Sequence, residues 1–206
     1  MTDDLERRLA ARDTPELDLD ALRADLARRA ADAGLLDVAH ASFDSPLGPL
    51  TVFVTPRGLL QLSYPGEPLA AQLDEVAARI SPRILAAPER TDAVRRQLDE
   101  YFSGQRRRFD VPIDWRLVRG FAGNVLRATS RIPFGSVSSY RAVATDAGSP
   151  NAYRAAGNAL GSNPIPIVVP CHRVLHAGGG LGGYTGGLDR KRFLLGLEGV
   201  LDPGRP

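Results

Sequence analysis

The chain has 206 residues, of which 43% are hydrophobic and 24% are charged, and its formal net charge is +2. This length and composition are typical of a globular protein with one large or two small domains. Because the charges nearly balance, any surface for nucleic acid has to come from local clusters of basic residues, almost all of which are arginine. The single cysteine excludes an internal disulfide and a cysteine-rich metal site, and it fits a reducing compartment.

The first residues, Met1-Thr2-Asp3-Asp4, are acidic, and no apolar run approaches the length of a membrane span. We therefore expect neither a signal peptide nor a membrane anchor, and we predict a cytoplasmic protein, nucleoid-associated if bacterial.

Residues 1–41 are predicted to form an N-terminal helical extension, with helix to about residue 37. Leu19, Leu22 and Leu26 recur at helical spacing, and Gly34 is a suitable C-terminal cap. We expect this amphipathic helix to pack on the body of the protein or on a partner.

Residues 42–115 are predicted to form a small α/β domain. Turn clusters rich in proline and glycine separate two β-branched and leucine-rich runs, which indicate a hairpin. Helical spacing and a short apolar run then predict two helices with a strand between them. The expected strands are 50–54, 59–62 and 83–87, and the expected helices are 69–80 and 92–102. The arginine run at 106–108 is more typical of a solvated face than of a ligand site, and the domain boundary is expected at 112–115.

Residues 116–206 are predicted to form a mostly helical domain, with helices over 118–131, 138–147 and 152–160. The last two, joined by a short turn containing Gly148, have the layout of a helix-turn-helix motif. Many helix pairs share this layout, so it does not by itself identify a DNA-binding motif. The second helix, however, carries small residues around one long cation, Arg154, which allows close approach to a nucleic-acid backbone.

The only cysteine, Cys171, follows the apolar run 167–169 and Pro170. The run is typical of a buried strand that ends at the proline, so the thiol is expected at a strand terminus. His172 is a candidate for the base that activates the thiol, although neighbours in a strand point to opposite faces, so the two could meet only through a turn or a bridging water. The alternative interpretation, an inert buried cysteine, does not explain the Pro-Cys-His-Arg context.

The helix pair and the cysteine segment together resemble the O6-alkylguanine-DNA alkyltransferases, also called methylated-DNA-protein-cysteine methyltransferases. The resemblance covers about four-fifths of the chain and leaves the N-terminal helix unexplained. It rests on Asp44-Ser45-Pro46-Leu47-Gly48, Tyr101-Phe102-Ser103-Gly104, Phe134-Gly135, Ser139-Tyr140, Arg154, Gly157, Asn163-Pro164, Pro166-Ile167, Pro170-Cys171-His172-Arg173, Gly182, Tyr184, Gly186-Gly187-Leu188 and Glu198-Gly199.

The resemblance implies an α/β fold: a ribonuclease H-like sheet with helices, followed by a winged-helix-like DNA-binding domain. It implies that Cys171 takes an alkyl group irreversibly from O6 of a flipped-out guanine, and also from O4 of thymine, without a cofactor or a metal. In the implied relay, His172 receives the thiol proton through a water and Glu198 orients His172. Tyr140 would donate to the guanine ring, and Asn163 would hold the turn that carries the cysteine.

The resemblance also implies a partner, double-stranded DNA containing O6-alkylguanine, bound through the minor groove by a monomer that can act cooperatively on DNA. Arg154 would replace the extruded base. The residues implied to contact DNA are Arg154, Ala152, Tyr153, Gly157 and Arg173. Those implied to line the base pocket are Pro166, Val174, Tyr184, Thr185 and Gly186.

Two positions depart from the family pattern. Tyr153 stands where many relatives carry a basic residue, and Thr185 where many carry another polar residue after the tyrosine, which bears on damage preference. The zinc-binding cysteine quartet of the adaptive-response regulators is also missing. Two other readings compete with repair: a non-catalytic alkyltransferase-like lesion-binding protein, which Cys171 argues against, and a cysteine hydrolase, which needs an intermediate that water can resolve.

Overall fold

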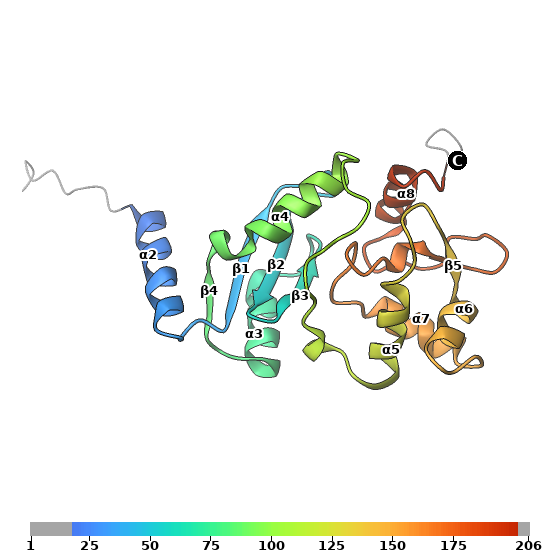
Figure 1. The fold of residues 1–206 in the computed structure, drawn as a ribbon, viewed down its shortest axis with the longest axis horizontal. Coiled ribbons are helices and arrows are strands. Elements are labelled where there is room, and N and C mark those ends of the chain that lie inside the picture. Colours follow the sequence, from blue (N-terminus) through green and yellow to red (C-terminus); the bar gives the residue numbers. More distant parts are fainter. Residues whose placement is uncertain (1–17, 202–206) are drawn as a thin grey trace, which may run out of the picture.

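A computed structural model describes residues 18–201 as a sheet domain and a helical domain, with helix α2 beside the sheet domain (Figure 1). In the described residues no helix is both long and apolar enough to cross a membrane. The strands of the sheet domain are β1 (Val38–Phe43), β2 (Leu50–Thr55), β3 (Gly58–Ser63) and β4 (Ile84–Ala86), and its helices are α3 (Leu69–Arg79) and α4 (Pro88–Phe102).

The sheet has strand order β3-β2-β1-β4, with β1–β2 and β2–β3 antiparallel and β1–β4 parallel. Each helix covers one face of the sheet, because side chains alternate along the strands. Val52 and Val54 of β2 pack in the core that contains Leu98 of α4, whereas Phe53 packs in the core that contains Val76 of α3. The predicted α/β domain is therefore a three-layer unit.

The helical domain begins after the 3₁₀ turn η1 (Trp115–Leu117). Its helices are α5 (Gly120–Thr129), α6 (Tyr140–Asp146), α7 (Tyr153–Gly161) and α8 (Leu188–Leu197), and two-residue strands β5 (Ser138–Ser139) and β6 (Val174–Leu175) pair in parallel. The predicted helix-turn-helix corresponds to α6 and α7, and the Ser139 side chain caps α6 by accepting from the Ala142 amide at 3.1 Å. Neither β1 nor α8 was predicted from the sequence.

Helix α2 (Leu19–Asp32) differs from expectation in the face it buries. Leu19, Leu22 and Leu26 are 58%, 51% and 56% exposed, while Ala27 is buried. The helix contacts the short strand β4, and its alanine side chains allow this close packing. The part of the predicted helix before residue 18 lies outside the described residues.

The expected boundary between residues 41 and 42 is wrong in detail, because it falls inside β1. Backbone pairing of Val38 with Ile84 and of Ala39 with Val54 already places residues 38–41 in the sheet. The sheet domain therefore starts at Val38.

Candidate active site

The cysteine segment does not form the predicted strand. Pro164, Pro166 and Pro170 lack amide donors, so the run between them cannot complete a ladder. Instead, the Val168 amide donates to Pro166 O and the Val169 amide to Ile165 O, both at 2.9 Å. The segment is a compact turn, and Cys171 begins the 3₁₀ turn η2 (Cys171–Arg173).

This turn contains backbone strain at Ile167, which has a φ of 73° and is the one non-glycine residue with positive φ in the described part of the chain. A β-branched residue in this region is an outlier that persists only where its surroundings impose it. Here the Leu62 amide of β3 donates to Pro164 O at 2.8 Å, so the sheet domain helps to hold the turn.

Asn163 connects this turn to the thiol. Its Nδ2 donates to Val169 O at 2.8 Å and to Cys171 Sγ at 3.1 Å, and its Oδ1 accepts from the Ile165 amide at 3.0 Å. The side chain thus connects the turn to the sulfur.

His172 and Glu198 meet although 26 residues separate them, because α8 packs on η2. His172 Nε2 lies 2.9 Å from Glu198 Oε1, and both side chains are fully buried. His172 Nδ1 is buried and has no hydrogen-bond partner in residues 18–201. A carboxylate at Nε2 favours the tautomer in which Nδ1 is the acceptor, so an ordered water at Nδ1 is the simplest partner for it.

Arg173 is placed differently from expectation. It is buried, with Nε donating to Glu198 Oε2 and Nη2 to Oε1, each at 2.8 Å, and Nη1 donating to Ile132 O. The expectation that Arg173 contacts DNA is therefore wrong, since its donors are committed to the interior and releasing it would leave the Glu198 charge buried and unpaired.

The charges of this cluster are balanced. Burial by itself raises the pKa of Glu198, but hydrogen bonds and charge from His172 and Arg173 bring that pKa down to about 2. Burial lowers the pKa of His172 despite its bond to Glu198, so the imidazole is neutral. Burial raises the pKa of the Cys171 thiol, while Asn163 and the charge of Lys191 oppose that rise. The resting cluster is thus a neutral thiol, a neutral imidazole and one ion pair.

Lys191 is a functional candidate that was not predicted from the sequence. It is the only lysine of the chain and is fully buried in α8, where Nζ donates to Val174 O at 2.7 Å and to Leu181 O. Burial lowers its pKa to about 8. A lone lysine in a chain that otherwise uses arginine is the signal that could have revealed it.

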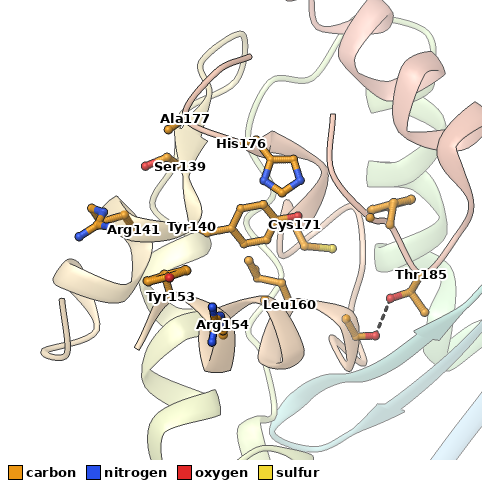
Figure 2. Close-up of a pocket in the computed structure, with 14 residues that line it drawn as sticks. Ser139, Tyr140, Arg141, Tyr153, Arg154, Leu160, Cys171, His176, Ala177 and Thr185 are labelled. Atoms are coloured by element: carbon orange, nitrogen blue, oxygen red, sulfur yellow. Dashed lines mark hydrogen bonds between the residues drawn. The ribbon is translucent and has the colours of Figure 1, made fainter. Parts of the chain in front are cut away.

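Cys171 lies at the wall of a cavity of about 710 Å³, a size suited to a small organic group. Figure 2 shows Tyr140 and His176 next to the thiol, with Tyr153 and Arg154 projecting from α7. The expected residues that line this cavity are Cys171, Tyr140, Tyr153, Arg154, Gly157, Tyr184 and Thr185; Arg141 and His176 were not predicted.

Three of the expected pocket residues lie elsewhere. Val174 is fully buried in β6, Pro166 lines an adjacent cavity of about 510 Å³ that also reaches Cys171, and Gly186 lies against the Tyr64 ring. Ala152 is the N-cap residue of α7 and is half-buried. The placement of Val174 inside the core corrects its assignment to the pocket lining.

Two glycines lie beside Tyr140, and one of them is required for its approach. A Cβ at Gly157 would lie 3.7 Å from the Tyr140 ring, which is ordinary contact, whereas one at Gly182 would lie 2.6 Å from the Tyr140 hydroxyl. Burial, with a smaller effect of Cys171, raises the pKa of Tyr140, so this hydroxyl is a neutral donor. It faces the cavity that holds the thiol.

The outer end of the cavity is cationic and aromatic. The guanidinium groups of Arg141 and Arg154 lie 5.3 and 5.8 Å from the centre of the exposed Tyr153 ring. Cations beside an exposed aromatic ring are suited to phosphates and stacked bases. The site can therefore bind a nucleobase deep in the cavity and its backbone at the rim.

Comparison with known proteins gives consistent matches over both domains. One family model, described as the ribonuclease-like domain of 6-O-methylguanine DNA methyltransferase, matches residues 38–115, and another, described as its DNA binding domain, matches residues 120–200. A methylated-DNA--protein-cysteine methyltransferase from Mycolicibacterium paratuberculosis is 42% identical over 166 residues, which cover 78% of this chain and 92% of the relative. A protein of the same name from Methanosarcina acetivorans is 36% identical over 160 residues, 78% of this chain and 97% of the relative.

The solved structures agree. The crystal structure of Mycobacterium tuberculosis OGT in complex with DNA is 39% identical and superimposes with a TM-score of 0.66, covering 78% of this chain and 92% of that one. The structure titled Mycobacterium tuberculosis O6-methylguanine methyltransferase gives a TM-score of 0.68 at 37% identity, covering 82% and 96%.

Proposed function

The chain belongs to the 6-O-methylguanine DNA methyltransferase family, and we propose that its single cysteine, Cys171, accepts the alkyl group in the repair reaction. The protein acts in direct-reversal DNA repair, as a methylated-DNA–protein-cysteine methyltransferase. The acceptor in such a reaction is a cysteine of the protein itself, and this sequence offers only one. The observation that carries the assignment is that this cysteine lines the cavity that Tyr140 and Arg154 also line.

In the proposed reaction the sulfur of Cys171 attacks the alkyl carbon on O6 of guanine. The S–C bond forms as the C–O6 bond breaks, which leaves S-alkylcysteine and an anionic guanine. The thiol proton passes through a water to His172 Nδ1, which is buried and has no partner among residues 18–201. The proton that leaves the thiol equals the proton that the guanine anion takes up. The net reaction therefore converts the Cys171 thiol and O6-alkylguanine into a thioether and guanine.

Each neighbour contributes a defined interaction. Tyr140 donates its hydroxyl proton to the guanine ring as negative charge moves onto it, and recovers a proton from the imidazolium through water. Asn163 donates to the sulfur and stabilises the thiolate, and the charge of Lys191 acts in the same direction. Glu198 keeps the His172 tautomer in which Nδ1 accepts.

DNA binding is proposed through the minor groove, with α7 as the helix that enters it. The small side chains at Ala152 and Gly157 permit close approach, and Arg154 fills the space of the extruded base. Tyr153 and Arg141 contact the backbone beside it. We further propose that the protein works as a monomer, on thymine O4 adducts as well as guanine, and that it is cytoplasmic, and nucleoid-associated if the host cell is bacterial.

Intact-protein mass spectrometry after incubation with duplex DNA containing O6-methylguanine tests the proposal. One methyl group on Cys171 at one equivalent of lesion is expected, and the Cys171→Ala variant should bind the DNA without gaining mass. Unmodified DNA of the same sequence is the control. An unchanged wild-type mass with retained binding would instead indicate a lesion sensor, and demethylation without an adduct would indicate a hydrolase.

A further inference from the structure

The carboxylate of Glu198 is held from both domains. Tyr101, near the end of α4 in the sheet domain, donates its hydroxyl to Glu198 Oε1 at 2.7 Å, across 97 residues of sequence. Tyr101 is fully buried and Glu198 is 5% exposed, so water does not compete for this contact. The relay in the helical domain thus includes a group that the helical domain does not supply.

The same carboxylate oxygen accepts three hydrogen bonds. His172 Nε2 lies 2.9 Å, Arg173 Nη2 2.8 Å and Tyr101 Oη 2.7 Å from Oε1. Donors that share one acceptor compete for its charge, so each bond is weaker than it would be alone. Loss of the Tyr101 hydroxyl therefore leaves more negative charge on Glu198 Oε1 to interact with the His172 imidazole.

The Tyr101 ring is fixed by aromatic neighbours. Its centroid lies 5.6 Å from that of Phe102, 5.2 Å from that of Phe109 and 6.1 Å from that of Phe134. Burial and the charge of Glu198 raise the pKa of Tyr101, so its hydroxyl stays protonated. The hydroxyl is a permanent donor whose position is set by packing.

We propose that Tyr101 is a positioning residue of the transfer reaction, through which the sheet domain sets the basicity of His172. This inference rests on the proposed function of the relay. By taking part of the Oε1 charge, Tyr101 keeps His172 neutral at the pH where it has to accept the thiol proton. The other charged or titratable groups around His172 are Glu198, Arg173, Lys191 and Cys171, and Tyr101 contacts only the first of them by a hydrogen bond.

The test is the pH dependence of single-turnover methyl transfer, measured by adduct formation between pH 5 and 8. Tyr101→Phe keeps the ring and removes the hydroxyl. The transfer rate falls at low pH as His172 becomes protonated, and we call this part of the pH profile the acid limb. In Tyr101→Phe the acid limb should move to higher pH by roughly one unit, because His172 becomes more basic by the amount expected when a hydrogen bond to a charged group is lost. The readout is the pH at the midpoint of the acid limb, which does not depend on the limiting rate that each protein reaches at pH 8.

Thr91→Val is the matched control. Thr91 is also a buried residue of α4, and its hydroxyl donates to Pro88 O at 2.8 Å without touching the relay. This variant loses a buried hydroxyl from the same helix, and its acid limb should coincide with that of the wild type.

An acid limb of Tyr101→Phe that coincides with the wild type would overturn the inference, as would an equal shift in Thr91→Val. A wild-type protein that forms no adduct would refute the proposed function instead. If Tyr101→Phe does not fold, NMR of the wild-type protein tests the proposal. The hydroxyl proton of Tyr101 should then give a slowly exchanging signal with a nuclear Overhauser effect to the His172 ring. Rapid exchange of that proton would contradict the proposal.

Discussion

His172 Nε2 lies 2.9 Å from Glu198 Oε1, and both side chains are fully buried in the core. The carboxylate is ionised there, and it pairs with the Arg173 guanidinium as well. A buried ion pair of this kind depends on both partners, since loss of one leaves an uncompensated charge. The stability of the protein should therefore report on the protonation of Glu198.

The first prediction concerns acid stability. The pKa of Glu198 is lowered from 4.5 to about 2 in the folded protein, so its contribution is complete above pH 4.5 and is lost as the pH falls toward 2. At neutral pH this contribution is about 3 kcal/mol. The free energy of unfolding of the wild type should exceed that of Glu198→Gln at pH 6, and the difference should shrink at pH 3. Urea denaturation at both pH values measures it.

Glu75→Gln is the control for this measurement. Glu75 forms an ion pair with Arg79 on the surface of α3, and both side chains are nearly half exposed. Its substitution should change the free energy of unfolding by less than about 0.5 kcal/mol at either pH. Parallel pH dependence of wild type and Glu198→Gln would contradict a strongly ionised Glu198.

The second prediction concerns Lys191 in the basic range. Its pKa is lowered from 10.5 to about 8, so the unfolded chain holds this proton to higher pH than the folded protein does. Stability therefore rises between pH 8 and 10.5 by up to about 3 kcal/mol relative to a variant without the amine. The free energy of unfolding of the wild type minus that of Lys191→Met should increase from pH 7.5 to pH 10. The neighbouring exposed residue provides the control, since Arg192→Met should show no such trend.

Some of this architecture could be predicted from sequence, and some could not. The hairpin and the pair α6–α7 follow from local periodicity and capping, which residues such as Ser139 encode directly. The cysteine segment was misread because Ile167 to Val169 have strand composition, while the prolines around them remove the amides that a strand needs. Here backbone donors, and not side-chain preference, decided the structure.

Glu198 was predicted for the site, whereas its partner Tyr101 was not. The two residues lie on different domains, so no local pattern could pair them, although Tyr101 stands in a stretch that already resembled the family. Arg173 was misplaced for the opposite reason: a basic residue next to the cysteine suggested DNA contact, whereas burial of Glu198 required a cation inside. Helix α2 shows that periodicity identifies a helix without identifying the face it buries.

The third prediction tests Arg154. If its side chain fills the space of the extruded base, Arg154→Ala should slow transfer from duplex DNA at least about tenfold, since unstacking a base costs a few kcal/mol. Transfer from the free base O6-methylguanine needs no extrusion and should change less than about twofold. The ratio of the two rates, from single-turnover measurements on the same protein preparation, is the readout. Equal slowing on both substrates would remove Arg154 from base extrusion and place its effect in the pocket.

The fourth prediction concerns the loop that closes the pocket. A Cβ at Gly182 would lie 2.6 Å from the Tyr140 hydroxyl, and the residue has a φ of 67°. Gly182→Ala should therefore displace the hydroxyl that donates to the guanine ring and should lower the transfer rate about tenfold or more, as expected when one hydrogen-bond donor to developing charge is lost. The matched control is Gly179→Ala, because Gly179 has a φ of 81° in the same loop and no atom of the described residues lies within 4 Å of its added Cβ. Both variants bear the backbone strain of an alanine at positive φ, about 1 kcal/mol, and Gly182→Ala adds the overlap with Tyr140. Gly182→Ala should therefore be the less stable of the two, and when folded protein is compared only Gly182→Ala should lose activity. Equal transfer rates in the two variants would show that the loop, and not the position of Tyr140, limits the reaction.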